Sequence, residues 1–174
     1  MNEFKIPHVK IHSSISQIAR RVANDDMEYI NRLMAESGKF QTVATSRTMA
    51  VVRNLDPDAA ENVIALYLVV WGIYRQYPAC CHTAVTQQQF ERVQQRNISM
   101  FRYLEKEDDS GLFGEIVHFD HEKLHHGELM MYVSRCFQSW PSLARLDINE
   151  YCTTLIGMKT VIECFGEIAQ SDEE

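Results

Sequence analysis

One apolar stretch, DPDAAENVIALYLVVWGIYRQYP at residues 56–78, decides the fold. Asp56 suits the N-cap of a helix, and Pro57 suits its first turn because proline needs no amide hydrogen there. The apolar residues of Val63–Tyr74 cover most sides of this helix instead of one stripe. Since a helix that is apolar all round is buried, the stretch predicts a central helix with the rest of the chain packed around it.

The segments on both sides of this helix also show helical periodicity, with apolar residues three and four positions apart. Two of their starts, Thr86 to Gln89 and Asp147 to Glu150, match capping boxes. No strand pattern of comparable length is present. We therefore predict an all-α fold, a single compact bundle of about six helices over residues 13–37, 40–54, 57–77, 86–106, 112–139 and 147–169.

The N-terminal part of the chain departs from this regular pattern in two places. Pro7 breaks the apolar alternation at the start, so we expect residues 1–12 to form a short extended arm and residues 13–170 to form a single helical-bundle domain. Asn24-Asp25-Asp26 interrupts the apolar stripe of the first helix and predicts a bend or break there. A length of 174 residues suits one ordinary domain.

Charge and composition exclude several classes of protein. The net charge is −7 and the pI about 5.5, the wrong sign for a protein that binds phosphates, so nucleic acid is not an expected partner. The charge is uneven: residues 1–55 hold eight Lys/Arg against five Asp/Glu, a net charge of +3. The remainder, with a net charge of −10, suits a basic protein partner.

The longest apolar run and the cysteines predict where the protein resides. Val63–Tyr74 is much shorter than the roughly 20 residues of a membrane span, so we expect no membrane association. The five cysteines are an odd number without framework spacing, and the first residues do not resemble a secretory leader. We therefore expect a cytoplasmic protein with reduced thiols.

A histidine-rich segment, EIVHFDHEKLHHGELMMYVSRC at residues 115–136, carries the candidate metal site. On a helix, His118, His121 and His125 fall within about 60° of one another and share one face. The i, i+4 spacing of His121 and His125 lets both imidazoles bind one metal ion. These three histidines are the candidate ligands of one divalent ion such as Zn, Ni or Fe.

The run HEKLHHGEL, residues 121–129, resembles the fourth-helix motif of DinB-like four-helix bundles, where a His-x-x-x-His pair precedes a glycine. The resemblance implies that His121 and His125 bind nickel, zinc or a similar ion, which in that family serves thiol-dependent transferases or hydrolases. The family also uses a third histidine on the second helix. Residues 40–77 contain no histidine, so only His8, His12 or His82 remains to complete such a set.

Two readings of the function stay open. The chain has no GxSxG, GxxxxGK or GxGxxG motif, and no complete catalytic constellation can be assembled from its residues. We therefore expect a non-catalytic cytosolic interaction or regulatory protein that binds another protein, with no cofactor and no activity as an enzyme. A second copy of this chain is one option for the partner. The alternative is a bundle that binds a divalent metal ion, with or without enzyme activity. If no metal binds, we expect His118 to pair with Glu115 or Glu122 at the rim of the bundle. A further option is that one of the histidines acts in pH sensing or acid–base chemistry.

Overall fold

A computed structural model describes residues 8–105 and 127–171, and every regular element in these two ranges is a helix. The predicted all-α class is confirmed. The described residues form nine helices: α1 (His8–Ala23), α2 (Met27–Phe40), α3 (Thr42–Val52), α4 (Pro57–Tyr74), α5 (Pro78–His82), α6 (Gln87–Glu105), α8 (Gly127–Ser139), α9 (Pro141–Ala144) and α10 (Ile148–Gln170).

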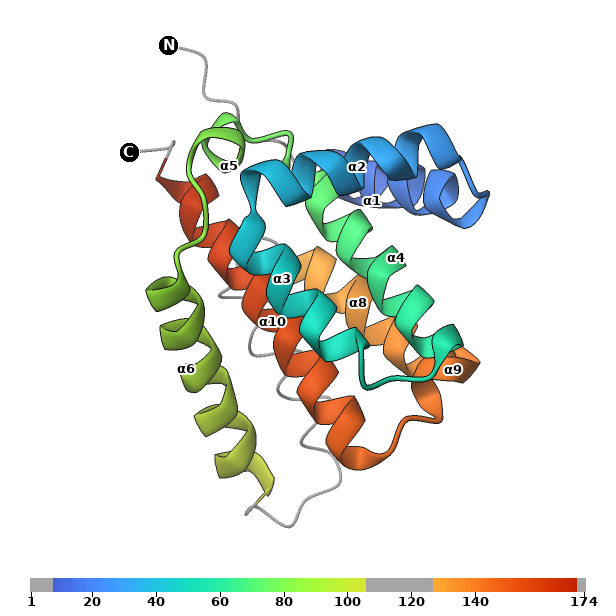
Figure 1. Ribbon diagram of the computed structural model, residues 1–174, viewed down its shortest axis with the longest axis vertical. Coiled ribbons are helices and arrows are strands. Elements are labelled where there is room, and N and C mark those ends of the chain that lie inside the picture. The colour runs from blue at the N-terminus through green and yellow to red at the C-terminus, as the bar shows by residue number, and fades with distance from the viewer. Residues whose placement is uncertain (1–7, 106–126, 172–174) are drawn as a thin grey trace.

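Two long apolar helices, α4 and α10, form the centre of the bundle (Figure 1). Every residue of α4 from Leu66 to Tyr74 is buried, as the all-round apolar pattern predicts. The ring of Phe165 on α10 packs against Trp71 and Tyr74, with centroids 5.8 and 5.4 Å apart. The Tyr74 hydroxyl also donates to the Ile162 carbonyl at 3.0 Å, so rings and a hydrogen bond join the two helices.

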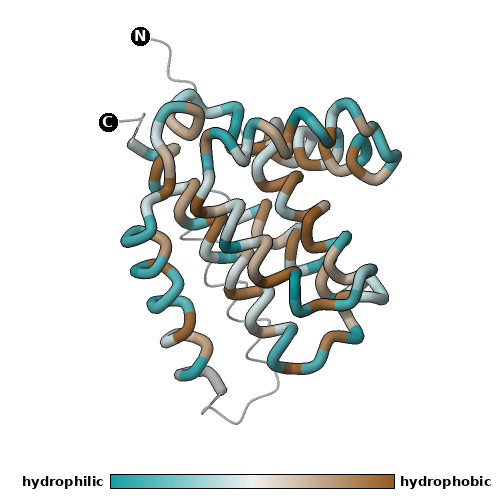
Figure 2. Tube along the Cα trace, viewed as in Figure 1, coloured by the Kyte–Doolittle hydropathy of each residue, from teal (hydrophilic) through white to brown (hydrophobic). Residues whose placement is uncertain are grey.

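The remaining helices cover this pair. Helices α1 and α2 lie side by side across one end of the bundle, and α3 and α6 run along α10 (Figure 1). Helix α6 is hydrophilic over most of its length (Figure 2), and its buried residues Phe90, Val93 and Asn97 share one face. Across the described helices, none is both long enough and apolar enough to cross a membrane.

The helix starts follow local sequence signals. Asp56 caps α4 by accepting a hydrogen bond from the Ala59 amide at 3.0 Å, and Asp147 and Glu150 form the predicted capping box of α10. Short helices α5 and α9 each begin at a proline, Pro78 and Pro141. These two short helices and the division of the first helix account for the difference between about six expected helices and the nine described.

The structure corrects the expected N-terminal boundary. Helix α1 begins at His8, so the expected extended arm over residues 1–12 is wrong for residues 8–12, and residues 1–7 lie outside the described ranges. Ile11 is the first buried residue of a helical stripe that continues with Ile15 and Ile18. Pro7 precedes the first helical residue, a position that a helix tolerates.

The predicted break at Asn24-Asp25-Asp26 is confirmed. Helix α1 ends at Ala23, and Asp25 has a left-handed backbone with φ of 53° that turns the chain. Asp26 then caps α2 through the Tyr29 amide at 3.1 Å and accepts two hydrogen bonds from Arg21. The expected helix over residues 13–37 is therefore two helices.

Candidate functional site

The sequence-predicted metal ligands are not tested by the structure. His118, His121 and His125 lie in residues 106–126, outside the described ranges. His82 is exposed at the end of α5, and the side chains of His8 and His12 lie outside the description as well. Within the described residues, no group of three or more His, Cys, Asp or Glu side chains is arranged to hold a metal ion. The metal site stays a prediction.

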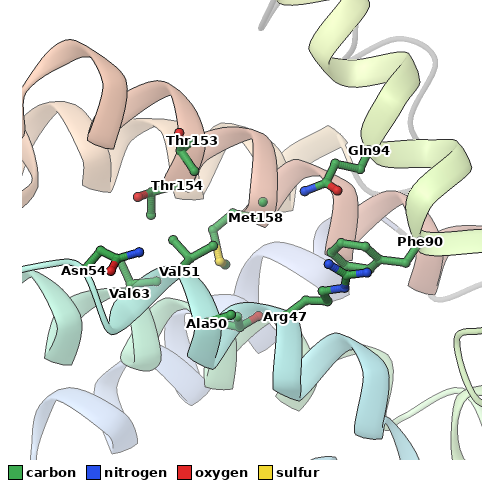
Figure 3. A pocket seen from close by; sticks show the side chains of 12 residues that line it. Arg47, Ala50, Val51, Asn54, Val63, Phe90, Gln94, Thr153, Thr154 and Met158 are labelled. Carbon is green, nitrogen blue, oxygen red and sulfur yellow. The ribbon is translucent and has the colours of Figure 1, made fainter. Parts of the chain in front are cut away.

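The structure shows a different feature, a pocket of about 200 Å³ where α3, α6 and α10 meet (Figure 3). We call it the anchor pocket. Its lining comes from four helices: Arg47, Thr48, Ala50, Val51 and Asn54 at and just beyond α3, Val63 from α4, Phe90 and Gln94 from α6, and Thr153, Thr154, Gly157 and Met158 from α10.

Helical spacing places these side chains around the pocket. Phe90 and Gln94 are one turn apart on α6, and Thr153 and Gly157 are one turn apart on α10. Gly157 contributes no side chain: a Cβ there would meet only Val51 Cγ2, at 3.8 Å, an ordinary van der Waals distance. A space therefore remains between α3 and α10 at this position. The buried side chains of Val63 and Met158 add to its apolar lining.

The polar groups around the pocket are of two kinds. The hydroxyls of Thr48 and Thr154 donate to carbonyls of their own helices, those of Ala44 at 2.9 Å and Glu150 at 2.6 Å. In the part of the chain that the structure describes, the side-chain amides of Asn54 and Gln94 form no hydrogen bond. These two carboxamides are available to donate to, or accept from, a bound molecule.

Of the described residues that line the pocket, Arg47 is the single ionisable one. Its guanidinium carbon lies 5.7 Å from the ring centroid of Phe90, and its Nη2 donates to Oε1 of Glu91 at 3.0 Å (Figure 3). Gln87 Nε2 donates to the same Glu91 oxygen. Arg47 is thus held at the pocket with one fixed positive charge and most of its N–H donors uncommitted to these contacts.

A second candidate, a buried charged cluster, joins α6 to α10. Lys159 Nζ lies 2.5 Å from Glu163 Oε1 and donates to Asn97 Oδ1 at 3.0 Å. Asn97 Nδ2 donates to the other Glu163 oxygen at 2.6 Å, and Thr160 contacts Asn97 at 3.2 Å. Because each buried charge is matched by an opposite charge and a hydrogen bond, the cluster suits a structural role in the helix contact.

Three of the cysteines that the structure describes are poorly suited to nucleophilic catalysis. Burial raises the pKa of Cys164 to about 12, and burial also raises the pKa of Cys136 and Cys81 above the ordinary thiol value. Thiolate, the nucleophilic form, is therefore scarce at neutral pH. Among the described residues, no cysteine, histidine, lysine or carboxylate lines the anchor pocket.

Sequence reasoning missed both features. Gly157 stands in the apolar part of a long helix, and such a glycine signals a close approach or a gap. Lys159 and Glu163 are four residues apart on a helix whose other residues there are mostly apolar, a spacing that signals an ion pair. Neither the glycine nor the charge spacing predicts which helix packs against α10 at that position.

Comparison with known proteins gave no match to a protein-family model, a curated protein or a solved structure. The resemblance of residues 121–129 to the DinB-like motif therefore stays a prediction from one short segment.

Proposed function

We propose that this protein is a non-catalytic helical binding protein that takes one apolar side chain of a protein partner into the anchor pocket. The observation that carries the proposal is the pocket between α3, α6 and α10, where apolar walls meet uncommitted carboxamides and none of the described lining residues is a catalytic base. This combination suits recognition of a folded or peptide partner.

The size of the pocket supports one side chain as its occupant. Small-molecule sites enclose roughly 300–1,000 Å³, whereas this pocket has a volume of about 200 Å³. Protein interfaces obtain much of their binding free energy from single large side chains that fill such pockets inside a polar rim. A leucine, methionine or phenylalanine side chain is the matching occupant.

The polar rim supports a peptide backbone around that side chain. Asn54 lies in the turn just beyond α3 and Gln94 lies on α6, so the two carboxamides approach the pocket from different segments of the chain (Figure 3). A carboxamide both donates and accepts, as backbone amide groups require. A partner segment therefore finds an apolar pocket and hydrogen-bonding groups at one place.

The test is a selection of random dodecapeptides displayed on phage against the intact protein, with counter-selection on Gly157→Leu. Leucine at this position directs a side chain into the space beside Val51 and fills the pocket. We expect enriched peptides to share one large apolar residue and to lose at least tenfold in affinity for the filled variant. Peptides that bind both proteins equally, or no enrichment at all, would contradict the proposal.

Two further variants serve as a control and as an independent way to block the pocket. Gly38→Leu makes the same chemical change on the exposed side of α2, where a Cβ meets nothing within 4 Å, and it is expected to leave peptide binding unchanged. Ala50→Trp replaces an exposed residue that lines the pocket from α3 and covers the pocket without altering α10. Loss of peptide binding in both Gly157→Leu and Ala50→Trp, with a native circular dichroism spectrum for at least one of them, supports the pocket as the binding site.

A further inference from the structure

We propose that Arg47 binds a carboxylate beside the apolar anchor of the partner, so that the anchor pocket selects an acidic segment. The inference rests on the proposed function and adds the chemistry of the residue that follows or precedes the anchor. It assigns Arg47 as the residue that determines charge specificity.

The placement of Arg47 supports this role. It is the one ionisable side chain among the pocket-lining residues that the structure describes, and 37% of that side chain is exposed. The ring of Phe90 lies under its guanidinium, and both residues line the same cavity. A segment that places an apolar side chain in the pocket therefore brings its neighbouring residues next to a fixed positive charge.

The existing partner of Arg47 can be exchanged. Glu91 is 57% exposed, and such exposed pairs are weak because water solvates both charges. Glu91 also accepts from Gln87 Nε2, so it keeps a donor when the guanidinium turns toward another carboxylate. A guanidinium has five N–H groups, of which the contact with Glu91 uses one, and it binds carboxylates in a two-point geometry.

The described charged side chain that lines the pocket, Arg47, is opposite in sign to the net charge of the chain, and its partner Glu91 is not among the described lining residues. The sequence carries a net charge of −7, which by itself favours a basic partner. At physiological salt, however, charges are screened over about 8 Å, so the group in contact with the occupant dominates over distant carboxylates. At the anchor pocket that group is Arg47, and the segment it favours carries a negative charge.

The test uses the tightest peptide from the phage selection, synthesised with Glu, Gln or Lys on both sides of its apolar anchor. Fluorescence anisotropy gives Kd for the wild-type protein and for Arg47→Glu, Arg47→Gln, Glu91→Gln and Gly157→Leu. For the wild-type protein we expect the Glu form to bind about fivefold more tightly than the Gln form, and the Lys form to bind most weakly.

The variants then distinguish the charge preference set by Arg47 from the binding of the apolar side chain in the pocket. Arg47→Glu is expected to reverse the order of the three peptides, Arg47→Gln to remove the preference, and Glu91→Gln to tighten the Glu form by removing its competitor. Equal binding of the three forms, with binding still lost in Gly157→Leu, would overturn the role of Arg47 and leave the proposed function standing. Binding that survives Gly157→Leu, or a selection that yields no peptide, would overturn both.

Discussion

Lys159 and Glu163 form an ion pair one turn apart on α10, with Nζ 2.5 Å from Oε1 and both side chains almost completely buried. Asn97 on α6 bonds to both charged groups, so the pair also joins two helices. Charges taken out of water are tolerated only while each has its partners. The contact between α6 and α10 therefore depends on both members being present together.

Removal of one member should be far more damaging than removal of both. We expect Lys159→Met or Glu163→Leu alone to lower the free energy of unfolding by about 3–5 kcal/mol, because each removes the nearest opposite charge from a buried charged group. The double variant Lys159→Met/Glu163→Leu should recover most of that loss. Urea unfolding of the four proteins measures the coupling, and additive losses would show that the pair is not a unit.

A second prediction concerns the close contact of α1 with α4 at Gly72. A Cβ at this position would lie 2.9 Å from Ile18 Cγ2, nearer than packed atoms approach. Gly72→Ala should therefore lower the free energy of unfolding by about 1–3 kcal/mol through overpacking. Combined with Ile18→Ala, which removes the obstructing methyl groups, the same substitution should cost less than it does alone.

Gly38→Ala is the matched control for that experiment. A Cβ at Gly38 meets nothing within 4 Å, and the residue lies inside α2. Alanine there should raise the free energy of unfolding by about 0.5–1 kcal/mol, since it restricts the unfolded chain and favours the helix. Stabilisation by both alanines to the same extent would mean that helix propensity, and not the Ile18 contact, governs Gly72.

Stability should fall at alkaline pH. Burial raises the pKa of Cys164 from 9.0 to about 12, and burial raises the pKa of Tyr67 and Tyr74 above the ordinary value of 10.0. Groups with a folded pKa above the unfolded pKa stabilise the fold fully below the unfolded value and lose that contribution as pH rises toward the folded value. Urea unfolding should therefore show a nearly constant free energy between about pH 7 and pH 8.5 and a decline above about pH 9. The decline should be shallower in Cys164→Ala, and a stability that stays constant to pH 11 would contradict this assignment.

Metal content separates the two readings of the sequence. A binding protein without cofactor predicts no stoichiometric metal in tag-free protein purified without chelator. Near-stoichiometric zinc, nickel or iron that disappears in His121→Ala/His125→Ala would instead support the metal site on the histidine segment. Elemental analysis of both proteins gives the answer without a known substrate.

The sequence predicted the parts of the fold that local residues determine. Asp56 with Pro57, and Asp147 with Glu150, mark helix starts through groups within one turn of each other, and both starts are as expected. The buried α4 was predicted because apolar residues cover most of its surface. Helices of four or five residues, α5 and α9, are too short to show a period.

The candidate site could not be predicted in the same way. Arg47, Phe90 and Gly157 line one pocket but are far apart in sequence, and the crossing of their helices is a property of the packed bundle. Lys159 occupies a position that helical periodicity assigns to the core, although a charged side chain is typical of the surface. Its burial is understood once its hydrogen bond to Asn97 on α6 is seen. The predicted ligands His118, His121 and His125 lie outside the described residues.

The most direct test of the account is an amide chemical-shift map of the isotopically labelled protein titrated with the tightest phage-selected peptide. Occupation of the anchor pocket predicts that the largest shifts cluster at Arg47–Asn54, at Phe90–Gln94 and at Thr153–Met158, and that they disappear in Gly157→Leu while Gly38→Leu retains them. Shifts centred on other helices, or shifts that persist unchanged in Gly157→Leu, would contradict the claim that this pocket is the binding site.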